Sequence, residues 1–154
     1  MDECAFMLGY DPGMDTTLPL ASASLPVRFV LYLPSMPDDS HLELKGIEDA
    51  VVKILCERFG GVTAYPAKGT FTMASGIAHT EAVTVLESYC EREAWRVSRA
   101  GLAAMAGLLA GLLGQEAIGC SVDGKMILIK AKEGHAPDAG QGRDLSALLR
   151  EAFS

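Results

Sequence analysis

The sequence has no closely spaced pair of cysteines, no apolar run long enough to span a membrane and no cofactor-binding loop, and each absence excludes a class of protein. Cys4, Cys56, Cys90 and Cys120 lie far apart without histidines at ligand spacing, so neither a zinc site nor a disulfide framework is expected. The uncharged run over residues 100–113 is shorter than the roughly 20 residues of a membrane span. No nucleotide-binding glycine motif occurs, and we expect no metal and no cofactor.

Basic character is also scarce. The net charge is −7, and residues 1–60 carry ten acidic side chains against four basic ones. Nucleic-acid binding is therefore not expected, because it depends on a basic surface that neutralises phosphates. The start, Met1-Asp2-Glu3-Cys4, is acidic where a secretory signal is basic, which predicts a cytoplasmic protein.

What the sequence has is enough apolar material for one core. It contains 154 residues, of which 49% are hydrophobic. We predict an N-terminal extension over residues 1–26, one domain over residues 27–130, and a flexible link with a short docking helix over residues 131–154.

The first half of this domain has clear periodicity. Residues 27–33 alternate between apolar and other side chains, which predicts a strand. Ser40 to Glu43 fit a capping box, which predicts the start of a helix. That helix repeats apolar residues at spacings of three and four and stops at Gly60-Gly61. Its predicted core positions are Leu44, Ile47, Val51, Leu55 and Phe59.

The second half predicts further strands and helices. Residues 62–89 favour two antiparallel strands, with turns or bulges at 66–69 and at Ser75-Gly76. Residues 91–113 favour a buried helix, whose Gly107 and Gly111 allow close packing against a sheet or a second helix. Strands over 117–122 and 125–129 flank Asp123-Gly124, a hairpin turn pair. Asp144 is placed to cap a terminal helix, whose apolar side would comprise Leu145, Leu148, Leu149 and Phe153.

This order predicts an α+β protein. We expect a ferredoxin-like β-α-β-β-α-β sandwich with an antiparallel sheet, an added C-terminal edge strand and a short C-terminal helix.

Several short motifs resemble those of a group of small uncharacterised bacterial and phage proteins. The motifs are Phe59-Gly60-Gly61-Val62-Thr63, Gly69-Thr70-Phe71, Glu81, and Gln115-Glu116 before the strand at Ala117. The resemblance covers roughly residues 28–129 and departs at Phe71, where the group usually has tryptophan. It implies a ferredoxin-like fold and no established activity.

Gln115-Glu116 is the first candidate site, because a polar pair between an apolar helix and an apolar strand must be solvated or hydrogen-bonded. If the sheet brings His79 or Glu81 to the same end, Glu116, Glu81 and His79 are candidate catalytic groups for proton transfer. Gln115, Glu116, Thr63 and Phe71 are the candidate ligand-binding residues. The alternative is structural: Gln115 and Glu116 cap the helix and orient the strand.

Two functions fit these observations. The first is a non-catalytic binding or regulatory module that makes protein-protein contacts, as a homodimer or as an accessory protein of a mobile element. The second is a small enzyme or small-ligand-binding protein with its site around Gln115, Glu116, Glu81 and His79. Convergence of these four side chains in space distinguishes the two.

Overall fold

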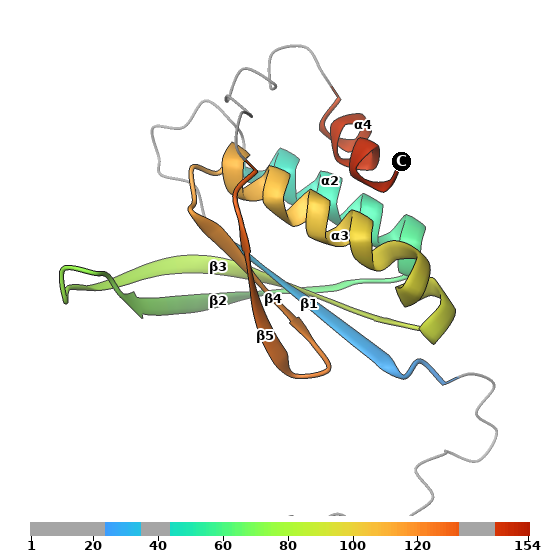
Figure 1. Ribbon diagram of the computed structural model, residues 1–154, viewed down its shortest axis with the longest axis horizontal. Helices are drawn as coiled ribbons and strands as arrows, with labels where there is room; N and C mark the ends of the chain where they lie inside the picture. The colour runs from blue at the N-terminus through green and yellow to red at the C-terminus, as the bar shows by residue number, and fades with distance from the viewer. Residues whose placement is uncertain (1–23, 35–43, 133–143) are drawn as a thin grey trace, which may run out of the picture.

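A computed structural model describes residues 24–34, 44–132 and 144–154. These segments contain five strands, three α-helices and one 3₁₀ turn. Figure 1 shows two layers, the sheet and the two long helices, with the short third α-helix outside them. The elements are β1 (Val27–Pro34), α2 (Leu44–Phe59), β2 (Thr63–Thr72), β3 (Ala78–Cys90), α3 (Arg92–Leu112), β4 (Ala117–Val122), β5 (Lys125–Lys130), α4 (Leu145–Arg150) and the 3₁₀ turn η2 (Glu151–Phe153).

The strands form one antiparallel sheet in the order β2-β3-β1-β4-β5. Helices α2 and α3 lie side by side on one face of this sheet, and α4 packs on the outside of the helix layer (Figure 1). The prediction of an α+β fold with an antiparallel sheet is confirmed, and β5 forms the edge next to β4.

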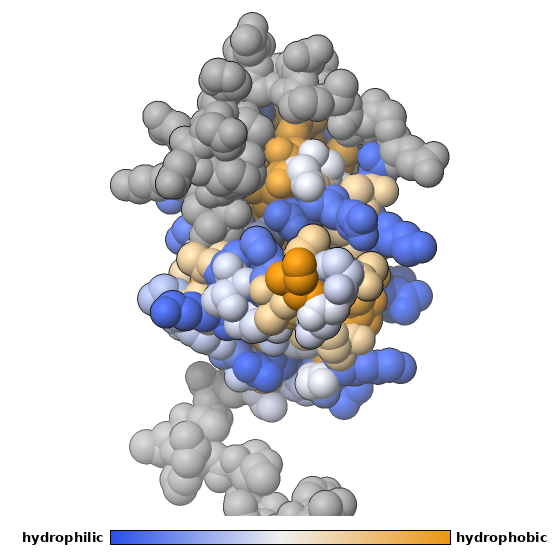
Figure 2. Space-filling view, turned by 90° about the vertical axis from the view of Figure 1, so that its left-hand side faces the viewer, coloured by the Kyte–Doolittle hydropathy of each residue, from blue (hydrophilic) through white to orange (hydrophobic). Residues whose placement is uncertain are grey.

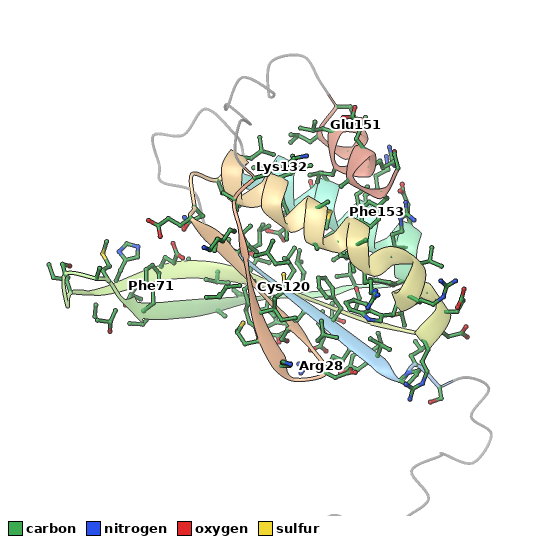
Figure 3. All side chains as sticks on the ribbon, viewed as in Figure 1. Arg28, Phe71, Cys120, Lys132, Glu151 and Phe153 are labelled. Atoms are coloured by element: carbon green, nitrogen blue, oxygen red, sulfur yellow. The ribbon has the colours of Figure 1, made fainter. Side chains whose placement is uncertain are left out.

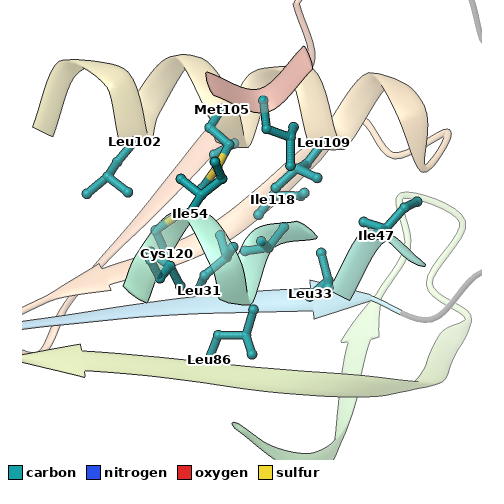
Figure 4. Close-up of a cluster of buried hydrophobic side chains, with 14 of the residues drawn as sticks. Leu31, Leu33, Ile47, Ile54, Leu86, Leu102, Met105, Leu109, Ile118 and Cys120 are labelled. Atoms are coloured by element: carbon teal, nitrogen blue, oxygen red, sulfur yellow. The ribbon is translucent and has the colours of Figure 1, made fainter. Parts of the chain in front are cut away.

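The core lies between the sheet and the helix layer. Alternate residues of β1, namely Phe29, Leu31 and Leu33, point into it, as the sequence period predicts. The α2 residues Ile47 and Val51 meet them from above (Figure 4 shows Ile47 beside Leu33). The sheet therefore buries one apolar face against the helices. No described helix covers its other face.

Helix α3 supplies the rest of the core. Leu102, Met105 and Leu109 are almost fully buried and point toward the sheet (Figure 4). The predicted close packing at Gly107 is present, because a Cβ there would lie 3.3 Å from the backbone oxygen of Lys130. No helix in the described segments is both apolar and long enough to cross a membrane.

One predicted turn is wrong. Residues 66–69 form neither a turn nor a bulge, since β2 pairs continuously with β3 from Thr63 to Thr72. Pro66 is tolerated because β2 is an edge strand that pairs only with β3, so not every backbone amide of β2 has to donate to a neighbouring strand. The reversal occurs at residues 73–77, where Gly76 has a φ of 83° and the Met73 amide donates to the Ile77 oxygen at 2.9 Å.

Two other local predictions are confirmed and one falls outside the described residues. Asp123 and Gly124 form the β4–β5 turn with φ values of 49° and 83°. The Asp144 carboxylate accepts a hydrogen bond from the Ser146 amide at 3.1 Å and so caps α4. The capping box at residues 40–43 and most of the link over 131–143 lie outside the described ranges.

Candidate functional site

The face of the sheet opposite α2 and α3 is not covered by any described element (Figure 1). We call it the open face. Strand residues that point to it alternate with core residues, so the register places Tyr65 of β2, Val85 of β3 and Tyr32 of β1 side by side. The same row continues through Gly119 of β4 to Leu128 of β5.

This row crosses a hollow of 340 Å³ on the open face. Its lining is almost entirely apolar and includes Tyr32, Ala67, Lys68, Gly69, Val83, Val85, Gly119, Met126 and Leu128. The volume lies within the range of roughly 300–1,000 Å³ that small-molecule sites occupy.

The hollow lies over Gly119, which has no side chain. Gly119 has no Cβ, and one built there would lie 3.6 Å from both the Met126 sulfur and Tyr32 Cδ2. The floor is therefore backbone at Gly119, while Tyr32 and Met126 stand around it as walls. Such a surface accepts a flat or apolar group, because the walls supply aromatic and sulfur contacts.

A first polar group, the Arg28–Glu87 pair, lies one row beyond the hollow. The Arg28 Nε donates to Glu87 Oε2 at 2.9 Å, and Nη2 donates to the same oxygen. The hydrogen bond to Glu87 raises the pKa of Arg28, and desolvation opposes this shift. Because Glu87 belongs to β3, these hydrogen bonds hold the guanidinium over the β3 part of the open face.

A second polar group lies at the other end, on the β2–β3 hairpin. His79 Nε2 is 3.9 Å from Glu81 Oε2, and the rings of Phe71 and His79 have centroids 5.1 Å apart. Glu81 pairs across the strands with Gly69, which lines the hollow. Figure 3 shows Phe71 on the hairpin and Arg28 well away from it. Along β3 the lining residues Val83 and Val85 lie between Glu81 and Glu87, so the hollow is flanked by polar groups on two sides.

The structure thus brings together three of the predicted site residues, Phe71, His79 and Glu81. Thr63 lies on the open face beside Glu87, at the other side of the hollow. Their roles in binding or catalysis stay predictions.

Gln115 and Glu116 lie at the α3–β4 junction. The Gln115 amide donates to the Ala110 oxygen at 2.9 Å, and the Gly114 amide donates to Gly111 while Gly114 has a φ of 64°. This is the Schellman ending of a helix. The Glu116 oxygen accepts from the Ala131 amide at 2.9 Å, and the Glu116 side chain is exposed. Within the described residues no hydrogen bond or ion pair joins this pair to His79 or Glu81, so the geometry favours the capping alternative.

Comparisons with known proteins add one finding about the fold. The sequence matches no protein-family profile and no curated protein. A solved phage SAM lyase in complex with S-methyl-5′-thioadenosine superposes with a TM-score of 0.53 at 13% identity, over 77% of this chain and 100% of that one. The chain shares its fold with this phage lyase. The apo phage SAM lyase superposes with a TM-score of 0.45 at 14% identity, over 71% of this chain and 90% of that one.

The sequence motifs pointed to phage and bacterial proteins, and the fold likeness is to a phage protein. The agreement extends to the fold alone, since the identity is 13%.

Most of the hollow could not be predicted from the sequence. The alternation along β1 predicts its core face, and the opposite face, which carries Arg28, Val30 and Tyr32, follows from the same alternation. Gly119 and Met126 gave no signal, because they contribute space and a wall only when β4 and β5 pair next to β1.

Neither Cys90 nor Cys120 supplies a nucleophile to this face. Burial raises the pKa of the Cys120 thiol to about 12, and burial also raises the pKa of Cys90. Both side chains are buried, so the thiolate form of each is suppressed.

Proposed function

We propose that this chain binds a thioether or sulfonium nucleoside of the S-adenosylmethionine (SAM) type in the hollow of its open face, and that it cleaves SAM. The observation that carries the proposal is the apolar hollow between two acidic groups, in a fold shared with a phage SAM lyase. It keeps the small-ligand alternative that the sequence left open, but moves the site from Gln115 and Glu116 to the hollow beside Glu81.

The lining suits the parts of such a ligand. An adenine ring is flat and stacks on tyrosine, and a thioether packs against methionine and apolar walls. Tyr32 and Met126 offer these contacts on either side of Gly119. The sulfonium of SAM carries a positive charge, which the carboxylates of Glu81 and Glu87 attract from two sides of the hollow.

The chemistry needs no protein nucleophile. When the bond between the sulfonium sulfur and the methionine γ-carbon breaks, both electrons go to sulfur and a neutral thioether leaves. In the same step either a base removes a proton from the β-carbon and that electron pair forms a carbon–carbon double bond, or the ligand's own carboxylate attacks the γ-carbon and forms a carbon–oxygen bond. Either route removes the sulfonium charge, so an apolar hollow favours the reaction over the charged ground state. Glu81, beside His79, is the proton acceptor that the geometry supports for the first route.

The test is to incubate the purified chain with SAM and to measure S-methyl-5′-thioadenosine by mass spectrometry. We expect formation above the spontaneous rate, and a loss of at least about tenfold in Gly119→Val, because the γ-carbons of valine occupy the hollow while its Cβ fits.

Gly61→Val is the matched control. A Cβ at Gly61 meets nothing within 4 Å and the backbone there is permissive, so this variant should keep the wild-type rate. Absence of both turnover and binding of S-methyl-5′-thioadenosine in the wild-type chain would contradict the proposal.

The finer description of the fold also belongs to this proposal. We infer a ferredoxin-like sandwich, because the order β4-β1-β3-β2 combines with the chain order β1-α2-β2-β3-α3-β4. Strand β5 then extends the sheet beyond β4.

A second candidate is the protein-binding module. It is favoured by apolar side chains at the end of the β2–β3 hairpin, where Phe71, Met73 and Ile77 are 47%, 50% and 66% exposed. Viewed from this end, apolar and hydrophilic side chains are mixed on the surface (Figure 2). We propose contacts with a second copy, or with a host protein if the chain serves a mobile element in the cytoplasm. Light scattering tests the first: a molar mass of 16.3 kDa would exclude the homodimer.

A further inference from the structure

The Arg28–Glu87 pair has hydrogen-bonding capacity left over. Both donors that Arg28 uses, Nε and Nη2, go to one oxygen, Glu87 Oε2. Within the part of the chain that the structure describes, Glu87 Oε1 and the Arg28 Nη1 have no hydrogen-bond partner. A guanidinium carries five N–H donors, so several remain for an anionic group, while Oε1 can accept from a cation.

The pair is open to a ligand. The Arg28 side chain is 41% exposed and that of Glu87 is 17% exposed. Glu87 lies opposite Val30, in the row next to the one that holds Val85 and Tyr32 of the hollow. Two residues along a strand span about 7 Å, so a ligand in the hollow reaches Glu87 through a chain of a few bonds.

A cation and an anion side by side match a zwitterion. An α-amino acid presents a carboxylate and an ammonium on adjacent atoms, and arginine binds a carboxylate with parallel N–H donors. SAM carries such a group a few bonds from its sulfur, whereas S-methyl-5′-thioadenosine does not.

We propose that Arg28 and Glu87 bind the α-amino-acid group of the ligand and so distinguish SAM from S-methyl-5′-thioadenosine. This inference rests on the proposed function. Arg28 takes the carboxylate, and Glu87 takes the ammonium through Oε1. Binding of the nucleoside itself depends on the hollow and not on this pair.

The test compares two ligands by calorimetry. S-adenosylhomocysteine has the amino-acid group but no sulfonium, and S-methyl-5′-thioadenosine has neither. We expect the wild-type chain to bind the first more tightly. In the variant Arg28→Met with Glu87→Gln, the affinity for S-adenosylhomocysteine should fall at least about tenfold, while that for S-methyl-5′-thioadenosine changes less than about twofold.

The matched control is the Arg96–Glu93 pair on α3, which has the same two-nitrogen contact and lies away from the open face. Arg96→Met with Glu93→Gln should leave both affinities unchanged. Circular dichroism should show both variants folded, since each double substitution removes both charges of its pair and leaves neither unpaired.

The outcomes separate the two ideas. If neither ligand binds the wild-type chain, the proposed function fails and this inference fails with it. If both ligands bind but the Arg28 and Glu87 substitutions weaken them equally, or weaken neither, the hollow stands and the amino-acid subsite is overturned.

Discussion

Gly101 on α3 makes room for the ring of Phe153 from the C-terminal turn. A Cβ at this position would lie 2.0 Å from Phe153 Cδ1 and 2.6 Å from its Cγ, closer than any real contact. The same ring lies 4.2 Å from the Arg58 guanidinium carbon, so three elements meet at one aromatic side chain.

Gly101→Ala is therefore expected to displace Phe153 and to lower the free energy of unfolding by about 1–3 kcal/mol. Made in a Phe153→Ala background, the same change should be neutral or stabilising by up to about 1 kcal/mol, because alanine favours helix over glycine. Denaturant unfolding of the four proteins measures the coupling. Additive effects would show that the ring does not occupy this slot.

Thiol reactivity is a second prediction about single residues. With a pKa near 12, Cys120 is a thiolate in only roughly one molecule in ten thousand at pH 8. Cys56, which is exposed, should react with iodoacetamide in the folded protein, and Cys90 and Cys120 only after denaturation. Peptide mapping by mass spectrometry checks the order. Rapid modification of Cys120 without denaturant would contradict its burial.

Among the elements, α4 depends on contacts outside its own short length. Leu148 and Leu149 are buried, and Arg150 donates to both Glu57 carboxylate oxygens at 3.0 and 2.6 Å. A helix of 6 residues is not stable alone, so its packing on α2 holds it in place.

The Glu57 pair makes this docking pH-dependent. The hydrogen bond from Arg150 lowers the pKa of Glu57, so the pair stabilises the docked helix above the ordinary carboxylate pKa. That contribution is lost as the pH falls below 4.5 and through the lowered pKa. The protection factors of the amides of residues 146–150 against hydrogen exchange should fall in this range. Arg150→Gln should remove this pH dependence. An unchanged pH profile in Arg150→Gln would exclude this pair as its source.

For the whole molecule, ligand binding at the open face should raise the melting temperature. At a ligand concentration about one hundred times Kd, binding stabilises by about 2.7 kcal/mol. In a protein of this size that corresponds to roughly 5–10 °C. S-methyl-5′-thioadenosine is the probe for a scanning measurement. The shift should vanish in Gly119→Val and persist in Gly61→Val, and a shift retained in Gly119→Val would place binding elsewhere.

The local sequence was sufficient for most elements, because their signals are short-range. Alternation in residues 27–33 identified the core face of β1, and Asp123-Gly124 identified the β4–β5 turn. Residues 66–69 were misread since proline and glycine usually break a strand, whereas an edge strand tolerates them. For the site, the sequence grouped His79 and Glu81 with Gln115 and Glu116, whereas the structure places these two residues beside Phe71 on the β2–β3 hairpin.

By itself the sequence determined which side chains share a strand face or a helix side, because that depends on periods of 2 and 3.6 residues. Only the tertiary structure decided which faces meet. Arg28 and Glu87 are 59 positions apart, and the hollow combines side chains and gaps from all five strands. Strand order and register are set by burying one apolar face of the sheet under α2 and α3. This burial involves residues from the whole chain, so no short segment of the sequence predicts it.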